Sequence, residues 1–269
     1  MTQHFDVEKA AQTIRRFLTG KLHQSGLTGY VVGMSGGVDS AVSAGLAVAA
    51  VGKDKVFGIL MPYRTSSPHS VEHATQYARQ LGIETLTIDI SPMIDAYFGT
   101  IEESNRLRAG NKMARERMSI LFDHAHRLGR LVLGTGNRTE IALGYTTWFG
   151  DSACSLNPIG ELYKTEVRAI ARQIGVPPAI IAKPPTADLW EGQTDEGEIG
   201  VQYERIDQML VQIIDRGVTS MSELERAGFS QTDLSRVVSL LNRNAFKRAL
   251  PEIAPLGRTP IPANLQLRS

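Results

Sequence analysis

The sequence predicts an α/β fold, in which a doubly wound parallel sheet is flanked by helices and followed by a helical C-terminal extension. Short apolar runs alternate with longer segments of helical periodicity from the N-terminus to about residue 143. Strands that alternate with helices form parallel sheets with right-handed crossovers, covered on both faces. The 269 residues suffice for one such core, and a composition of 42% hydrophobic and 21% charged residues is ordinary for a globular protein. We therefore expect residues 1–269 to form a single domain.

Changes in the spacing of the apolar residues predict the first helices and strands. Apolar residues at intervals of three and four predict an amphipathic helix over residues 5–23. The short apolar run at residues 30–34 is bounded by glycines, which is typical of a buried strand. Residues 38–51 are small and apolar nearly all round, which predicts a helix buried against the sheet.

The alternation then continues along the chain. We expect strands at 55–61, 84–90 and 130–134, and helices at 70–81, at about 105–128 and from about 138. Residues 145–160 show no clear period and residues 176–200 are rich in proline and glycine, so both are expected to be loops that are ordered or become ordered with ligand. Helices are expected again at 199–215, 221–226 and 232–250, before an extended tail from Pro251.

The charge and cysteine content argue against nucleic-acid-binding, membrane-binding and disulfide-bonded proteins. The chain has 29 basic and 28 acidic side chains, so we expect neither nucleic acid nor an anionic membrane as a partner. The single cysteine, Cys154, cannot form an internal disulfide. The first seven residues do not resemble a signal peptide, and no apolar run approaches the roughly 20 residues that a bilayer requires. We expect a cytoplasmic protein.

An octapeptide after the first strand carries the chemistry of a phosphate site. Its glycines let backbone N–H groups approach phosphate oxygens, its serines offer hydroxyls, and the helix that follows presents its positive end. The aspartate would repel phosphate unless it holds a bridging cation. The lysine of the P-loop NTPases is missing. The predicted nucleotide-binding residues are Gly33, Met34, Ser35, Gly36, Gly37, Val38, Asp39 and Ser40.

A second motif, residues 134–140, follows a later strand. Its Gly-x-Gly start is compatible with a Rossmann loop, but Thr139 stands where the third glycine belongs. Alternatively, Thr135 and Glu140 complete the site opened by the first loop. Because both loops leave the same edge of the sheet, Asp39 and Glu140 could share one Mg²⁺, an ion that prefers oxygen ligands. Glu140 could also be an ordinary first-turn acid that complements the helix dipole.

The motif Ser-Gly-Gly-Val-Asp-Ser resembles the pyrophosphate loop of the N-type ATP pyrophosphatases, which have an adenine nucleotide alpha hydrolase-like fold. Further blocks resemble the ammonia-dependent NAD synthetase family, and the resemblance extends to about Leu250. These blocks are residues 111–118, 134–140, 143–145, 149–151, 157–168, 183–196, 198–200 and 246–248.

This resemblance implies an ATP-dependent, Mg²⁺-requiring enzyme that converts nicotinic acid adenine dinucleotide (deamido-NAD) and ammonia into NAD. The carboxylate would be adenylated, and AMP and pyrophosphate released. The resemblance also implies a homodimer, to whose interface the long helix from Asn105 could contribute. A mobile ammonium at Lys164 can also neutralise developing phosphate charge. The implied ATP contacts are Gly33 to Ser40, Thr135, Lys164, Thr186 and, more weakly, Arg64; the magnesium ligands Asp39 and Glu140; the dinucleotide contacts Arg115 and Lys247; and the catalytic residues Asp39 and Lys164.

Three positions depart from the family pattern on the side that would touch the acceptor. Trp148 replaces a lysine, Ser155 an aspartate, and Phe246 a histidine. Another enzyme of the superfamily, amidating or thiolating a different acceptor, is therefore the alternative, as is a non-catalytic dinucleotide-binding protein. Residues 183–198 are a candidate lid. The sheet is expected to begin about 27 residues into the chain, which leaves no room for an N-terminal glutaminase domain, so we expect ammonia to be free or delivered by a partner.

Overall fold

Four parallel strands form the sheet, in the order β3-β2-β1-β4. The structure is a computed structural model that describes residues 5–99, 105–190, 192–257 and 259. The chain builds the sheet outward from β1 to β2 and β3, then returns to place β4 on the other side of β1. The order in which strands are added to the sheet therefore reverses between β1 and β4. At this point the loops that follow the two strands diverge and leave a crevice for ligands. The strands are β1 (Tyr30–Gly33), β2 (Val56–Leu60), β3 (Glu84–Thr87) and β4 (Leu131–Leu133).

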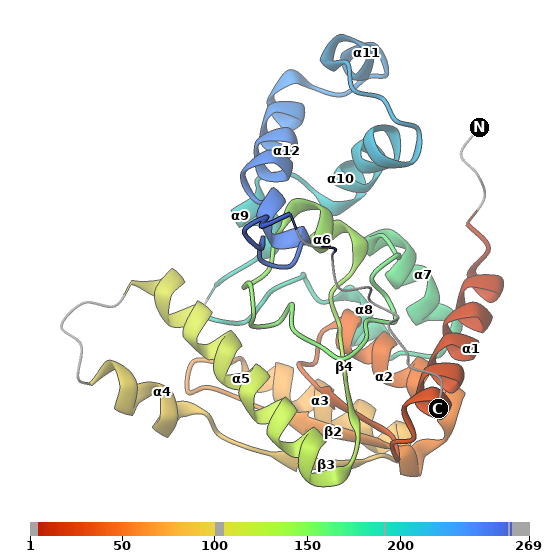
Figure 1. Ribbon diagram of the computed structural model, residues 1–269, viewed down its shortest axis with the longest axis vertical. Helices are drawn as coiled ribbons and strands as arrows, with labels where there is room; N and C mark the ends of the chain where they lie inside the picture. Colours follow the sequence, from red (N-terminus) through yellow and green to blue (C-terminus); the bar gives the residue numbers. More distant parts are fainter. Residues whose placement is uncertain (1–4, 100–104, 191, 258, 260–269) are drawn as a thin grey trace.

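Helices cover both faces of the sheet, as the alternating pattern predicted (Figure 1). Side chains alternate along β1, so Val32 packs against α2 and α7 while Val31 packs against α5. The predicted all-round burial of the second helix is confirmed, because most of α2 lies in the core. One face carries α1 (Val7–Ser25), α2 (Val38–Val51), α3 (Pro68–Leu81) and α7 (Lys164–Gln173), and the other α4 (Ser91–Phe98) and α5 (Arg106–Leu128).

The C-terminal helices have an apolar core of their own and pack on α6 and α7. Figure 1 shows α10, α11 and α12 gathered at one end of the molecule, beyond α6. The predicted helical extension is thus confirmed. Among the described residues, no helix is both long and apolar enough to cross a bilayer. The remaining elements are η1 (Lys53–Lys55), α6 (Arg138–Leu143), α8 (Pro178–Ala182), α9 (Asp195–Ile199), α10 (Tyr203–Leu210), the π-helical turn η2 (Val211–Asp215), α11 (Met221–Arg226), α12 (Gln231–Arg243) and η3 (Ala245–Arg248).

Several expected boundaries were wrong, and side-chain hydrogen bonds explain two of them. The strand expected to reach residue 90 ends at Thr87, because the Asp89 carboxylate turns the chain by accepting from the Ser91 amide, and the unexpected α4 begins there. The helix expected over 232–250 ends at Arg243, where the Asn244 amide donates to the α6 carbonyl of Leu143.

The segment expected as a loop over 176–200 contains α8 and α9, and the helix expected over 199–215 is broken into α9, α10 and η2. Gly200 breaks it, since its positive φ of 83° ends α9 in the left-handed conformation. Residues 251–257 form neither helix nor strand, while most of the tail beyond them lies outside the described residues.

Candidate functional site

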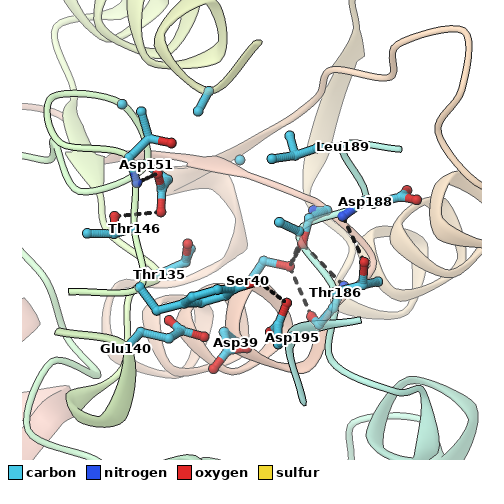
Figure 2. Close-up of a pocket in the computed structure, with 18 of the residues that line it drawn as sticks. Asp39, Ser40, Thr135, Glu140, Thr146, Asp151, Thr186, Asp188, Leu189 and Asp195 are labelled. Atoms are coloured by element: carbon cyan, nitrogen blue, oxygen red, sulfur yellow. Dashed lines mark hydrogen bonds between the residues drawn. The ribbon is translucent and has the colours of Figure 1, made fainter. Parts of the chain in front are cut away.

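A cavity of about 720 Å³ opens where the loops leave the carboxyl ends of β1, β2 and β4. This volume is within the usual range for a small-molecule site. The residues expected to bind nucleotide and metal line it, with the exception of Gly36 and the weaker candidate Arg64. Figure 2 shows Asp39, Glu140 and Asp195 at one end, with Thr186 and Asp188 on the opposite wall from Thr135.

The octapeptide after β1 forms a tight loop whose serines hold each other. The two hydroxyls of Ser35 and Ser40 lie 3.0 Å apart, and the Ser35 hydroxyl accepts from the amide of Gly37 at 3.2 Å. No described side chain caps the start of α2. Its first N–H groups are therefore available to an anion, at the positive end of the helix.

Gly36 is the residue that lets this loop form. Its φ is +74°, and a Cβ there would lie 2.1 Å from the carbonyl oxygen of Ser70 at the start of α3. Both the left-handed conformation and the close approach therefore require glycine. The loop is held against α3 by this contact, which leaves its other side facing the cavity.

Three charged side chains from three segments meet in front of this loop. The Lys164 ammonium donates to Asp39 Oδ2 at 2.6 Å and to Glu140 Oε1 at 3.3 Å. The lysine side chain is 2% exposed, while the two carboxylates are 17% and 18% exposed. The two acids expected to share a cation are thus neighbours, and one lysine ammonium contacts both of them.

Burial governs the charges of this cluster. Burial raises the pKa of Glu140 to about 8; the neighbouring carboxylates of Asp39 and Asp195 add to the rise, and Lys164 opposes it. Burial also works against the charged form of Lys164, but Asp39 and Glu140 outweigh it and raise the pKa of the ammonium. The lysine therefore stays protonated, so the cluster holds a permanent cation.

Asn137 and Tyr203 complete the cluster, although the sequence reasoning did not single them out. The Asn137 amide donates to Asp39 Oδ1 at 2.9 Å, and its oxygen accepts from the Glu140 amide in a capping box at the start of α6. The Lys164 ammonium lies 5.0 Å from the centre of the Tyr203 ring, a cation–π contact. The asparagine could have been found, because Asn-x-x-Glu before a helix is a capping signature; Tyr203 carries no such signal.

Two tyrosines lie against a further carboxylate in the cavity. Asp195, which is 4% exposed, accepts from the hydroxyl of the buried Tyr203 at 3.1 Å, while the hydroxyl of the partly buried Tyr145 lies 3.3 Å from Asp195 and 2.6 Å from Glu198, to which it donates. Burial raises the pKa of Asp195, with Lys164 opposing the rise. The phenol rings and Asp195 thus form the wall beside Lys164.

The candidate lid lies against the start of α3. The Asp188 carboxylate accepts from the Ser67 amide and from the Ser70 hydroxyl, which also accepts from the Lys183 ammonium at 2.7 Å. Within this segment, Thr186 lines the cavity and accepts from the Asp188 amide. Asp188 has a φ of +52°, a strained conformation for a non-glycine residue. Ser70 thus contacts both the phosphate loop, at Gly36, and the candidate lid, at Asp188.

The two residues expected to bind the acceptor are differently placed. Lys247 lines the cavity, with its ammonium donating to the carbonyls of Gly144 and Thr146 at 2.9 and 2.7 Å. Arg115 is not among the described residues that line the cavity, and its guanidinium donates to the Trp148 carbonyl at 3.3 Å. Arg117, two residues further along α5, does line the cavity, with its Nε donating to the Met61 carbonyl. Arg64 is also outside the cavity lining and forms an ion pair with Asp95.

Two of the three unusual positions form one aromatic cluster. The ring of Trp148 stacks on Phe149 at 4.4 Å and meets Phe246 edge-on at 5.3 Å. Phe246 is 55% exposed. Ser155 lies apart from them, where its hydroxyl accepts from the Val132 amide of β4. Trp148 and Phe246 thus contact each other at the surface, whereas Ser155 completes the edge of the sheet.

Comparison with known proteins gives consistent matches. The family model described as NAD synthase matches residues 10–251. The NH(3)-dependent NAD(+) synthetase of Trichlorobacter lovleyi is 47% identical, over 91% of this chain and 92% of that protein. Two solved structures cover 93% of this chain and 99% of their own. One is an NMN synthetase from Francisella tularensis (TM-score 0.84, 33% identity). The other is an NH3-dependent NAD synthetase from Campylobacter jejuni in complex with the nitrate ion (TM-score 0.80, 32% identity).

Proposed function

This chain belongs to the NAD synthase family, and from that membership and the geometry of the cavity we infer its reaction. It catalyses the ATP-dependent amidation of deamido-NAD with ammonia to NAD, with release of AMP and pyrophosphate. The observation that carries this proposal is the meeting of Asp39, Glu140 and Lys164 in front of the glycine-rich loop.

ATP would lie along the crevice between β1 and β4. The open N–H groups at the start of α2, with the hydroxyls of Ser35 and Ser40, suit the triphosphate. Thr135 and Thr186 offer hydroxyls from the opposite walls, and both line the cavity. Residues 33–40, Thr135, Lys164 and Thr186 are therefore the proposed ATP contacts.

The carboxylates of Asp39 and Glu140 fit a magnesium ion. Both are oxygen donors, and a single lysine ammonium already holds them as neighbours, so the pair is arranged around a cation. Two carboxylates leave room in an octahedral shell for phosphate oxygens and waters. We propose that this pair holds Mg²⁺, which when bound neutralises charge on the phosphates.

The reaction makes a carboxylate electrophilic. The nicotinate carboxylate attacks the α-phosphorus of ATP, the bond to the bridging oxygen breaks, and pyrophosphate leaves. Ammonia then adds to the carbonyl carbon, and AMP departs with the acyl C–O bond electrons while the nitrogen loses a proton to give the amide. Lys164 faces the phosphates and stabilises charge on the departing pyrophosphate, while the loop and lid hold the reactants aligned.

Lys247 and Arg115 are the proposed contacts of the dinucleotide. Lys247 supports this proposal by lining the cavity, and Arg115 follows Ala114 of α5, which also lines it. Nicotinic acid mononucleotide is a second candidate acceptor. The similarity to a structure named NMN synthetase and the unusual residues of the acceptor side both favour testing it.

One assay tests the proposal. Purified protein is incubated with ATP, Mg²⁺, ammonium and either deamido-NAD or nicotinic acid mononucleotide, and AMP and the amide products are followed. We expect AMP and NAD in equal amounts with the dinucleotide. If AMP forms with the mononucleotide but not with deamido-NAD, the mononucleotide is the acceptor. ADP in place of AMP would exclude the pyrophosphatase chemistry.

We also propose a homodimer, acting in the cytoplasm where ATP and the dinucleotide are available. Large apolar side chains are exposed along α4 and α5, which suits an interface between two copies. These are Met93, Tyr97, Leu107 and Phe122, between 38% and 66% exposed. Light scattering of the purified protein would give the mass, and a monomer at assay concentrations would contradict the dimer.

A further inference from the structure

A buried carboxylate from the C-terminal helices reaches the start of two helices of the site. Asp207 of α10 is 4% exposed. Its Oδ1 accepts from the Thr139 hydroxyl at 2.5 Å, and its Oδ2 accepts from the Thr165 amide at 2.9 Å. The Thr139 oxygen in turn accepts from the Lys164 amide at 3.0 Å. One carboxylate therefore joins the first turns of α6 and α7; its contact with Thr139 is buried and its contact with Thr165 is partly buried.

Each of these contacts is one residue away from a group of the charged cluster. Thr139 precedes Glu140, and Thr165 follows Lys164. A shift of α6 relative to α7 would separate the ammonium from Glu140 Oε1, which is already at 3.3 Å. The carboxylate also lies at the amide end of α7, where a negative charge favours the helix start. These hydrogen bonds thus set the distance between the starts of α6 and α7.

We propose that Asp207 is a positioning residue, which acts through Thr139 and Thr165 to hold Lys164 and Glu140 in register for adenylation. This inference rests on the proposed function. It gives the C-terminal helices a part in the chemistry, because α10 supplies the group that aligns the two sides of the site. Asp207 is not among the described residues that line the cavity, so it acts through its partners and not on the substrates.

The same two helices offer a matched control in Asp215 of η2. This carboxylate accepts from the Arg138 guanidinium at 2.6 Å and from the Tyr163 hydroxyl at 3.0 Å; Arg138 is one position before Thr139, and Tyr163 is the N-cap residue of α7, two positions before Thr165. It contacts flexible side chains and not the backbone, and its own side chain is 40% exposed. Asp215 therefore helps to attach the C-terminal helices without fixing the helix starts.

Four substitutions distinguish the alignment of the α6 and α7 starts from the attachment of the C-terminal helices. Asp207→Asn keeps the shape but has a single acceptor oxygen, so either the Thr139 hydroxyl or the Thr165 amide loses its acceptor and faces an N–H group instead. Thr139→Val removes the hydroxyl and leaves the Lys164 amide without its partner. Thr139→Ser keeps the hydroxyl and serves as the conservative variant. Asp215→Asn is the control for attachment alone.

The experiment isolates adenylation by measuring ATP–pyrophosphate exchange in the presence of deamido-NAD and Mg²⁺, without ammonium. We expect Asp207→Asn and Thr139→Val to lower the exchange rate by about 10- to 100-fold, the order expected for a misplacement near 1 Å. Thr139→Ser should stay within about threefold of the parent, and Asp215→Asn within about twofold while its Tm falls. The KM for ammonium in the full reaction should not change, since the later step does not use this alignment.

Equal exchange rates in Asp207→Asn and Asp215→Asn, at matched folded fractions from circular dichroism, would overturn the inference. So would a Thr139→Val variant that exchanges as fast as the parent. If Asp207→Asn does not fold, the two threonine variants decide the matter. A parent protein that shows no exchange with deamido-NAD but forms AMP with another acceptor would refute the proposed function and leave the alignment testable with that acceptor.

Discussion

The two proposed halves of the site, one for the nucleotide and one for the acceptor, are built differently. In the nucleotide half, Asp39, Glu140 and Lys164 bind one another, and the residues around them come from α2, α6, α7 and α10. In the acceptor half, the cations bond to backbone carbonyls, as Lys247 does to Gly144 and Thr146. Rings there contact each other near the surface.

This difference indicates where the molecule tolerates change. In the nucleotide half each charged group is a partner of another, so removing one leaves a second uncompensated in a buried site. In the acceptor half a cation keeps its carbonyl contacts whichever neighbour changes, and an exposed ring loses only part of its packing. We therefore expect substitutions in the nucleotide half to affect the chemical step, and those in the acceptor half to affect the affinity for one substrate.

The largest expected effect is that of Asp39→Asn. The amide removes one charge of the proposed metal pair while keeping the shape, so turnover should fall by about 10³-fold or more, with the fold retained. The measurement is AMP formation, with circular dichroism to verify folding. Asp233→Asn, which affects a carboxylate paired with Arg205 in the C-terminal helices, is the control and should stay near the parent rate. Near-normal turnover in Asp39→Asn would refute the metal role.

Lys164→Met tests the buried cation. Its loss leaves the Asp39 carboxylate without its ion-pair partner beside Glu140, which should lower the free energy of unfolding by about 3–5 kcal/mol. Because the proposed Mg²⁺ can replace the missing charge, adding Mg²⁺ should raise the Tm of the variant more than that of the parent. Thermal unfolding with and without Mg²⁺, and with EDTA, measures this. An equal Mg²⁺ effect on both proteins would argue against a metal at this carboxylate pair.

Gly36→Ala tests the shape of the phosphate loop. The new methyl group would meet the carbonyl of Ser70, so the loop must move and the KM for ATP should rise. Gly52→Ala is matched to it, because Gly52 also has a positive φ, of 87°, but nothing lies within 4 Å of the added carbon. Gly52 has φ 87° and ψ 154°, a region used almost only by glycine, so we expect the control to cost about 1–3 kcal/mol of stability without a change in the KM for ATP.

The smallest effect is expected in the acceptor half. Trp148→Ala removes a stacked contact with Phe149 and an edge contact with Phe246, each worth about 0.5–1.5 kcal/mol. The KM for deamido-NAD should change by about 2- to 10-fold while the KM for ATP stays constant, which provides an internal control. A change in the KM for ATP of the same size would show that the two halves are not independent.

Local patterns predicted much of this protein. The alternation of strands and helices, the buried α2, and the glycine-rich loop follow from short-range rules of periodicity and backbone sterics, so they could be read from the sequence. The capping box of Asn137 and Glu140 belongs to the same class, because its partners are three residues apart. The strand after Glu84 was predicted too long because the competing Asp89 turn depends on one side-chain hydrogen bond.

The tertiary structure decided which distant residues meet. Lys164 is 125 residues from Asp39 and 24 from Glu140, and their contacts arise because α7 returns to the crevice between β1 and β4. Tyr203 and Asp207 carry no local signal, since their roles depend on how α10 packs against α6 and α7. The sequence alone determined the helices and strands and the candidate site residues, because both depend on short-range chemistry. Their assembly into one buried charged cluster depends on strand order and helix packing, which only the complete fold specifies.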